Sequence, residues 1–181
     1  MKAVIQRVID ASVTVDGVVK GKIGAGLLVY LGVAHNDSEP DADWLADKIV
    51  NLRIFNDAEG KMNLSLKDLL ARETALQKAR ETALQETCEV SPQSDQKNRN
   101  CACGALVISQ FTLLADARKG RRPSWNGAAA PEKAKQLYEY FIEAVRKHGI
   151  ICEQGEFQAH MMVSYTNDGP VTIVLDTECL K

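Results

Sequence analysis

Two hydroxyl side chains, Ser109 and Thr112, follow a short apolar stretch and precede a polar loop. The end of a buried strand often presents reactive groups, so these hydroxyls are the first candidates for nucleophilic chemistry. A lone hydroxyl without a neighbouring base is a weak nucleophile. The chain also lacks the GxSxG elbow of the α/β-hydrolases. The residues alone therefore favour ordinary hydrogen bonding at a strand end.

The three histidines are poor candidates for a catalytic base. His35 falls in a loop-like segment, His148 at the end of a predicted helix and His160 in a predicted strand. None has a partner at motif spacing, which favours solvated or structural roles. The five cysteines form no CxxC pair and have no histidine at ligand spacing, so we expect reduced thiols. We expect neither a metal site nor another cofactor.

The polar loop after Thr112 concentrates positive charge within five positions. Its cations are Arg118, Lys119, Arg121 and Arg122. Such a cluster is usually a solvated surface, but it is also the densest candidate for phosphate binding in the chain. The formal net charge of −2 argues against a protein that grips long nucleic acid over its whole surface. We therefore expect any contact with nucleic acid at this loop.

The segment Asn167-Asp168-Gly169-Pro170 lies between two alternating stretches near the C-terminus. The apolar residues that alternate around it are Val163, Tyr165, Val171, Ile173 and Leu175. Asp-Gly is a strong hairpin signal, and a proline directly after it suits the first residue or the edge of a strand. The local pattern predicts a plain turn between two half-buried strands.

Strands and two helices must position these groups. Residues 3–8, 12–15, 26–33 and 105–108 have strand patterns, the last running into Ser109. A first helix is predicted after the N-cap Ser38, and its expected buried face consists of Trp44, Leu45, Ile49, Leu52 and Ile54. A second helix is predicted over residues 131–148. The pattern predicts a mixed α/β domain with its helices on one side of a sheet.

Residues 71–86 form a tandem repeat, ARETALQK followed by ARETALQE. These residues favour a helix, but a repeat of eight drifts against about 3.6 residues per turn, so no apolar face is sustained. Residues 89–100 are almost wholly polar. We therefore expect residues 70–104 to form a surface insertion, an exposed helix with a mobile loop, in a single domain of residues 1–181.

The composition is that of an ordinary soluble globular protein. The chain has 181 residues, of which 45% are hydrophobic and 25% charged, enough for one domain with its own core. No run of apolar residues is long enough to span a membrane, and the N-terminus lacks the features of a signal peptide. We expect a cytoplasmic protein without a membrane partner.

These segments together resemble the D-aminoacyl-tRNA deacylases of the Gly-cisPro type. The resemblance begins with MKAVIQRVIDASVTVDG, continues through GLLVYLGV, RIFNDAEGKMNLSL, VISQFTLLAD and RRPSWNGAAAPEKAKQLYEYF, and ends with NDGPVTI. It leaves out roughly residues 70–104. Two motifs are specific: SQFTL at residues 109–113 and N-x-G-P-x-T at residues 167–172. Their order and separation also fit the family.

The resemblance implies a homodimer with a three-layer, mixed α/β fold. Gly169 and Pro170, joined by a cis peptide bond, would enter the active site of the other subunit and accept hydrogen bonds from the substrate's amino group. Arg7 would brace this backbone fork, and Asn167 opens the same motif. With the amino group held by these backbone carbonyls, the site would accept D-aminoacyl and exclude L-aminoacyl substrates, because the pocket leaves no volume for an L side chain.

The SQFT residues would line the pocket around the ester and the terminal adenosine at the 3′ end of aminoacyl-tRNA. They are Ser109, Gln110, Phe111 and Thr112. Backbone N–H groups near Phe111 and Thr112 would stabilise an oxyanion, and the terminal ribose 2′-hydroxyl would help to activate water. A mechanism in which Thr112 is a covalent nucleophile is the less favoured alternative. The implied activity is hydrolysis of D-aminoacyl-tRNA and glycyl-tRNA that spares L-aminoacyl-tRNA, and the basic loop would bind the tRNA.

Two departures and two alternatives remain. Gln158 stands where the family commonly has glycine, and Trp125 replaces the usual phenylalanine. One alternative function is a nucleic-acid-binding homodimer of the same fold without hydrolysis, which the retention of both motifs disfavours. The other is hydrolysis of small free D-amino-acid esters, which would not depend on the terminal ribose.

Overall fold

The computed structural model describes residues 1–86, 102–118 and 120–180. The strands are β1 (Lys2–Val15), β2 (Val18–Ile23), β3 (Gly26–Gly32), β4 (Phe55–Asn56), β5 (Met62–Leu64), β6 (Gly104–Ser109), β7 (Cys152–Gln154) and β8 (Met162–Asp176). The helices are α1 (Glu39–Val50), α2 (Leu66–Glu86) and α3 (Pro131–Lys147), with short 3-10 helices η1 (Phe111–Leu114) and η2 (Thr177–Leu180). No helix of the described part has the length and apolar character needed to cross a membrane.

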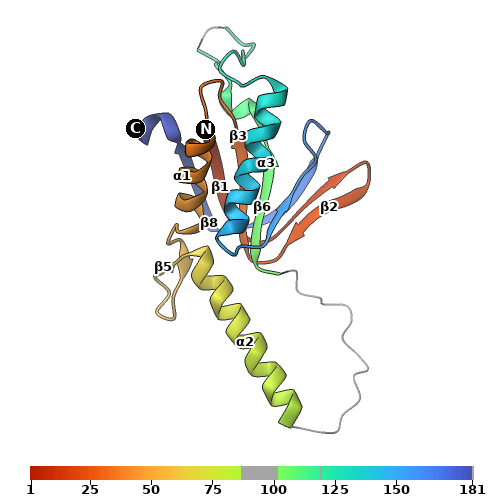
Figure 1. The fold of residues 1–181 in the computed structure, drawn as a ribbon, viewed down its shortest axis with the longest axis vertical. Helices are drawn as coiled ribbons and strands as arrows, with labels where there is room; N and C mark the ends of the chain where they lie inside the picture. Colours follow the sequence, from red (N-terminus) through yellow and green to blue (C-terminus); the bar gives the residue numbers. More distant parts are fainter. Residues whose placement is uncertain (87–101, 119, 181) are drawn as a thin grey trace.

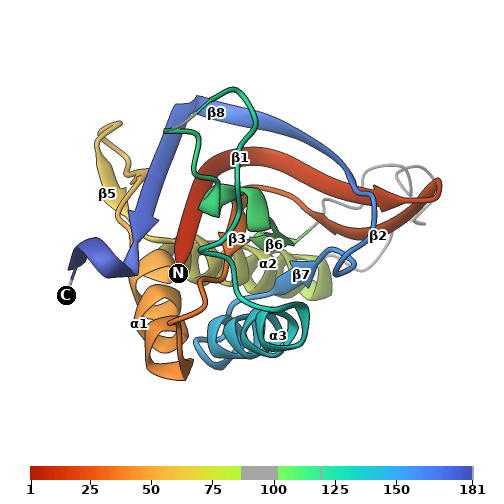
Figure 2. The ribbon, with the colours of Figure 1, turned by 90° about the horizontal axis from the view of Figure 1, so that it is seen from above.

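The main sheet is mixed and is organised around the long strand β1. Its strand order is β2-β1-β3-β6-β7, and β8 pairs along the other edge of β1. The first half of β1 pairs with β3 and the second half with β2, both antiparallel, whereas β6 is parallel to β3 and β7. Because β1 changes partner along its length, the sheet curls, as Figure 2 shows.

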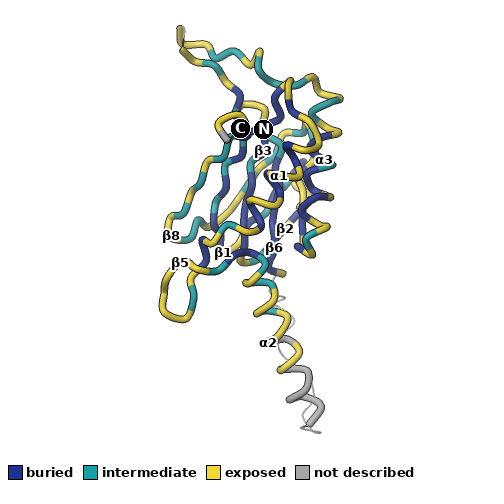
Figure 3. Tube along the Cα trace, turned by 60° about the vertical axis from the view of Figure 1, so that its left-hand side comes forward, coloured by how far each residue is buried: buried dark blue, intermediate teal, exposed yellow. Residues whose placement is uncertain are grey.

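The two faces of the sheet bury different sets of side chains. Helices α1 and α3 lie side by side on one face (Figures 1 and 2), which confirms the predicted arrangement. The alternating residues of β3 divide between the faces, since Leu27, Val29 and Leu31 point towards the helices and Leu28 points away. The second cluster on the far face is Val8, Ala11, Val13, Ile23, Leu28, Leu106 and Ile108. Figure 3 shows the buried residues gathered in these strands and on the inner sides of both helices.

Helix α1 begins as predicted but buries a narrower face. Ser38 caps it, since its hydroxyl and its backbone N–H both donate to the Asp41 carboxylate, at 2.7 and 3.0 Å. Leu45 and Ile49 are buried, but Trp44 is 38% exposed, so its predicted burial was wrong. The helix ends at Val50, and Leu52 and Ile54 reach the core from the following segment instead.

The predicted hairpin near the C-terminus was also wrong. Residues Met162–Asp176 form the single strand β8, and both of its halves pair with β1. Asn167 pairs with Val8 and Thr172 with Gln6, with register shifts nearby. The Asp-Gly signal is overridden because β1 is long enough to pair with the residues on both sides, so the chain bends at a bulge without reversing.

The tandem repeat is helical, and α2 begins before the insertion predicted at residues 70–104. Ser65 starts it with a capping box to Asp68, and Leu66 is buried in the core. Beyond this anchor α2 projects away from the body of the protein (Figures 1 and 3). The predicted loop falls largely on residues 87–101, outside the described residues.

Candidate active site

A cavity of about 830 Å³ opens where β6 ends at Ser109. Its walls come from the ends of β3 and β6, the start of α3 and the segment before β8. The lining residues are Leu31, Val33, Ile108, Ser109, Gln110, Phe111, Ala128, Ala129, Pro131, Ala134, Tyr138, Phe157, Gln158, Ala159, His160, Met161 and Val163. The structure therefore brings three of the four SQFT residues to one cavity, and Thr112 stands next to it.

The sharp bend after β6 presents the SQFT residues. The N–H of Gln110 donates to the Leu31 carbonyl at 2.8 Å, and the chain then turns into η1. Gly32 permits this close passage, since a Cβ there would lie 3.0 Å from the Gln110 carbonyl oxygen. Phe111 and Thr112 begin η1, where a helix leaves its first N–H donors without an intrahelical acceptor. Two backbone donors are thus available beside the cavity.

Among the described residues, no base is hydrogen-bonded to the Thr112 hydroxyl. This hydroxyl accepts a hydrogen bond from the side-chain amide of Gln110, which is a donor and takes no proton.

The buried thiols are also poor candidates for nucleophilic chemistry. Burial raises the pKa of both Cys103 and Cys152 to about 12, so these thiols stay protonated at neutral pH. Burial likewise raises the pKa of Tyr138 on the cavity wall, and its hydroxyl donates to the Val107 carbonyl at 2.8 Å.

The histidines differ in their relation to the cavity. His160 lies in the segment before β8 and lines the cavity, so its predicted place in a strand was wrong. His35 holds the loop before α3, because its backbone N–H donates to the Gly127 carbonyl at 3.1 Å. Nowhere in residues 1–86, 102–118 and 120–180 do three or more His, Cys, Asp or Glu side chains gather as a metal site would need.

Gln158 lines the cavity in an unusual backbone conformation. Its φ is +64°, in the left-handed region that glycine adopts without steric cost. A glycine, which the resemblance implies at this position, would adopt this conformation without strain. The chain here is also crowded, since a Cβ on Gly155 would lie 2.5 Å from the Met161 sulfur.

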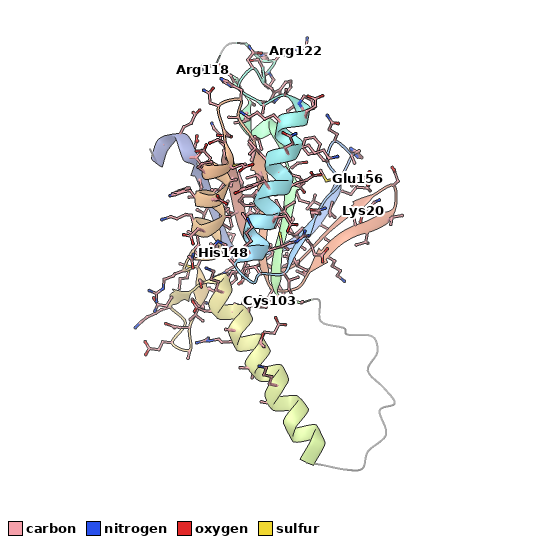
Figure 4. The ribbon with its side chains drawn as sticks, viewed as in Figure 1. Lys20, Cys103, Arg118, Arg122, His148 and Glu156 are labelled. Atoms are coloured by element: carbon pink, nitrogen blue, oxygen red, sulfur yellow. The ribbon has the colours of Figure 1, made fainter. Side chains whose placement is uncertain are left out.

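The basic loop projects beyond the cavity at the end of the molecule opposite α2, where Figure 4 shows Arg118 and Arg122. Its base is closed by a bridge between Asp116 and Ser124. Arg118 is bidentate on the Asp116 carboxylate, with N–O distances of 2.9 and 2.6 Å, and this holds the pKa of that carboxyl well below its usual range. Arg121 and Arg122 are exposed. Lys119 lies outside the described residues.

The Gly169–Pro170 peptide bond is cis, which confirms the prediction from the motif. Gly169 has a φ of +118°, a conformation that L side chains rarely adopt. A Cβ there would lie 2.9 Å from Val171 Cγ2 and 3.0 Å from Arg7 Nη2. Only glycine therefore fits this position without movement of its neighbours.

Arg7 ties the Gly169 segment to the rest of the fold. Its side chain is almost fully buried. Its Nε donates to the Asp168 carbonyl at 3.3 Å and forms an ion pair with the Asp168 carboxylate, with an N–O distance of 2.9 Å. Its Nη1 donates to the Ile54 carbonyl at 2.6 Å and lies 3.4 Å from Asn56 Oδ1. Asp168 was not among the predicted site residues, because the Asp-Gly pair indicated only a turn.

A second polar cluster holds the other side of the bend. The Asn167 side-chain amide donates to Gln6 Oε1 at 2.9 Å and to Thr172 Oγ1 at 3.4 Å, and the Thr172 hydroxyl also donates to Gln6. Asn167 therefore bonds within its own chain, across the paired strands β1 and β8. No signal in the sequence pointed to Gln6.

The Gly169–Pro170 segment and the strand end at Ser109 belong to different rows of the sheet. One row of paired residues, at the cavity end, consists of Ser109, Leu31, Ala3 and Leu175. Asn167, before the segment, belongs to the row of Gly104, Gly26 and Val8, and Thr172, after it, belongs to the row of Gln6 and Leu28. Along β3 these rows are five and three residues from Leu31, or about 16 and 10 Å. None of Arg7, Asn167, Gly169 and Pro170 lines the cavity.

The curled mixed sheet, with two helices on one face and a cavity at a strand end, defines the fold class, and comparisons with known proteins identify the family. The family model described as D-Tyr-tRNA(Tyr) deacylase matches residues 4–87 and 84–176. A D-aminoacyl-tRNA deacylase from Thermosipho melanesiensis is 48% identical over 179 residues, covering 98% of each chain. Another from Dehalococcoides mccartyi is 50% identical over 177 residues, covering 98% of this chain and 95% of the relative. The chain therefore belongs to the D-Tyr-tRNA(Tyr) deacylase family.

Two solved structures extend the comparison. The "c-Myc DNA Unwinding Element Binding Protein" has a TM-score of 0.73 and 34% identity, covering 97% of this chain and 98% of its own. A probable eukaryotic D-amino acid tRNA deacylase has a TM-score of 0.69 at 14% identity, covering 96% of this chain and 97% of its own. The second likeness shows the fold alone.

Proposed function

We propose that this protein hydrolyses the ester bond of D-aminoacyl-tRNA and of glycyl-tRNA in the cytoplasm, and that it spares L-aminoacyl-tRNA. Water adds to the ester carbonyl, the bond to the ribose oxygen breaks, and free amino acid and tRNA are released. Two relatives that are 48% and 50% identical over nearly the whole chain carry the name D-aminoacyl-tRNA deacylase. Such an activity would proofread the chirality of aminoacyl-tRNA before translation.

The observation that carries the proposal is the separation of the two motifs. Neither Gly169 nor Pro170 lines the SQFT cavity of its own chain. The residues that flank them belong to rows three to five residues from Leu31, or about 10–16 Å along β3. A twofold dimer places the same two surfaces against each other twice. We infer that the Gly169–Pro170 segment of one subunit completes the cavity of the other, so that the enzyme is a homodimer.

The composite site would select chirality through backbone atoms. Carbonyl oxygens of the Gly169–Pro170 segment would accept hydrogen bonds from the substrate's amino group. Arg7 and Asp168 hold the segment from one side, and the Gln6, Asn167 and Thr172 cluster holds it from the other. With the amine fixed and the ester in the cavity, the direction of the side chain depends on the configuration at Cα. Glycine has no side chain to exclude and would also be accepted.

Catalysis would need no nucleophilic side chain. The N–H groups of Phe111 and Thr112 begin η1 next to the cavity, where they could stabilise the oxyanion. The Thr112 hydroxyl has Gln110 as its partner and no base among the described residues. We propose that the 2′-hydroxyl of the terminal ribose helps to activate the attacking water. Ser109 and Gln110 would orient the ester, and the basic loop would contact the tRNA.

A panel of four substrates tests the proposal. The purified protein is incubated with D-tyrosyl-tRNA, L-tyrosyl-tRNA, glycyl-tRNA and a D-tyrosyl-tRNA that ends in 2′-deoxyadenosine. We expect rapid release of D-tyrosine and glycine, with L-tyrosyl-tRNA and the deoxy substrate nearly intact. Rapid cleavage of L-tyrosyl-tRNA would overturn the chirality account. Equal cleavage of the ribose and deoxyribose substrates would overturn the ribose-assisted mechanism.

A second candidate is nucleic-acid binding without hydrolysis. It is favoured by the 34% identity to a protein named as a DNA unwinding element binding protein, together with the projecting basic loop. This alternative predicts retained binding of nucleic acid but no release of amino acid from any substrate in the panel.

A further inference from the structure

Two large aromatic side chains stand exposed beside the cavity. Phe111 is 59% exposed and Trp125 is 38% exposed. Their rings meet edge to face, with centroids 5.7 Å apart and planes 64° from parallel. Phe111 lines the cavity and Trp125 follows the basic loop, so the pair lies between these two features.

Cations lie next to the aromatic pair in the same loop. Arg121 and Arg122 are exposed, and among the described residues neither has an acidic partner within ion-pair distance. Arg118, in contrast, is occupied by Asp116. Figure 4 places Arg122 on the loop that projects beyond α3. Aromatic faces combined with free guanidinium groups are the means by which proteins bind single-stranded nucleic acid.

We propose that Trp125 stacks on the base of the nucleotide that precedes the terminal adenosine, while Arg121 and Arg122 contact the adjoining phosphates. The proposal rests on the proposed function, which puts the terminal adenosine and its ester in the cavity beside Phe111. A strand leaving the cavity past Phe111 meets Trp125 next and the two guanidinium groups after it. The surface formed by these residues would thus hold the unpaired 3′ end of tRNA, whatever the amino acid.

Fluorescence gives a direct test of stacking. The chain has two tryptophans, so the variant Trp44→Phe leaves Trp125 as the only indole. We expect a single-stranded RNA that ends in CCA to quench this fluorescence to saturation, and a blunt duplex of the same length to leave it nearly unchanged. Binding of the single strand, measured independently, without any change in the fluorescence of Trp125 would overturn the proposal.

Comparing rates on two substrates shows whether Trp125 contacts the RNA or only supports the catalytic cavity. We expect Trp125→Ala to lower kcat/KM for D-aminoacyl-tRNA about 5- to 150-fold, the range of single-base stacking losses, and Trp125→Phe to lower it less. Neither variant should change the rate on 3′-D-aminoacyl-adenosine, which lacks the preceding nucleotide. Lys48→Ala, which removes an exposed cation of α1, is the matched surface control.

Other outcomes identify what would be wrong. Equal losses on both substrates would mean that Trp125 only supports Phe111, and a change in oligomer mass would assign Trp125 to a contact between subunits. Either result overturns the proposal. If the unmodified protein cleaves neither substrate, the proposed function fails, whereas saturable quenching by the single strand would still support RNA stacking at Trp125.

Discussion

Gly169 is the residue whose identity the backbone restricts most clearly. Its φ of +118° disfavours any L side chain, and its neighbours Val171 and Arg7 leave no room for a Cβ. The second restriction matters for function, because Arg7 is the side chain that braces the segment. A methyl group at this position would therefore displace the guanidinium as well as strain the backbone.

We expect Gly169→Ala to lose stability by about 1–3 kcal/mol and to lose most of its activity on D-aminoacyl-tRNA. The measurements are the free energy of unfolding from denaturant titration and the kcat/KM ratio for D- over L-tyrosyl-tRNA. Gly17→Ala is the matched control, since Gly17 also has a positive φ but its Cβ would meet nothing within 4 Å. It should cost stability without a change in the D/L ratio. Full activity of Gly169→Ala would contradict the proposed role of this segment.

At the scale of elements, the start of β1 is tied to the connection between β3 and α1. The Met1 ammonium donates to Asp37 Oδ1 at 2.6 Å and to the Thr177 hydroxyl of η2. The Ala34 N–H donates to the other oxygen of Asp37, also at 2.6 Å. Met1 is fully buried and Asp37 is 5% exposed, so this charge pair is closed off from water. The hydrogen bond to Thr177 joins the beginning of β1 to the segment that follows β8.

Removing one partner of this pair should leave an uncompensated buried charge. We expect Asp37→Asn to lower the free energy of unfolding by about 3–5 kcal/mol. Asp176→Asn is the matched control, because the Lys2–Asp176 pair is solvent-accessible and should contribute less than about 1 kcal/mol. Chemical denaturation of both variants at one pH measures the difference. Equal losses would show that burial does not set the strength of the Met1–Asp37 pair.

For the whole molecule, the proposed active site depends on two copies of the chain. The register of β1, β3 and β8 puts Gly169–Pro170 beside the middle of β1, and neither residue lines the SQFT cavity of its own chain. Two defects placed in different subunits would then leave one of the two composite sites intact in a mixed dimer. The same two defects within each subunit would leave none.

Mixed dimers test this arrangement. Phe111→Ala damages the cavity and Gly169→Ala damages the segment, so each homodimer should be nearly inactive. After the two variants are unfolded and refolded together, a purified mixed dimer should recover up to about half of the activity of the unmodified dimer. Deacylation of D-tyrosyl-tRNA measures this recovery. Its absence, in mixed dimers confirmed by mass, would contradict a site shared between subunits.

Much of the fold followed from local patterns in the sequence. The strand before Ser109, the start of α1 after Ser38 and the span of α3 each depend on neighbouring residues, so each was predicted correctly. The predictions failed where a distant segment decides the outcome. Trp44 fits the apolar face of α1 by spacing but is 38% exposed. The Asp-Gly pair lies inside β8 because the residues on both sides of it pair with β1.

The sequence by itself determined the family, the two motifs and the helices and strands that carry them. Only the tertiary structure decided how these parts are placed. It set Arg7 against Asp168 and the Ile54 carbonyl, it brought Phe111 and Trp125 together beside the cavity, and it separated the cavity from Gly169 along the sheet. The physical reason is that a motif consists of residues close together in the sequence, whereas the register of long strand pairs determines which distant residues come into contact.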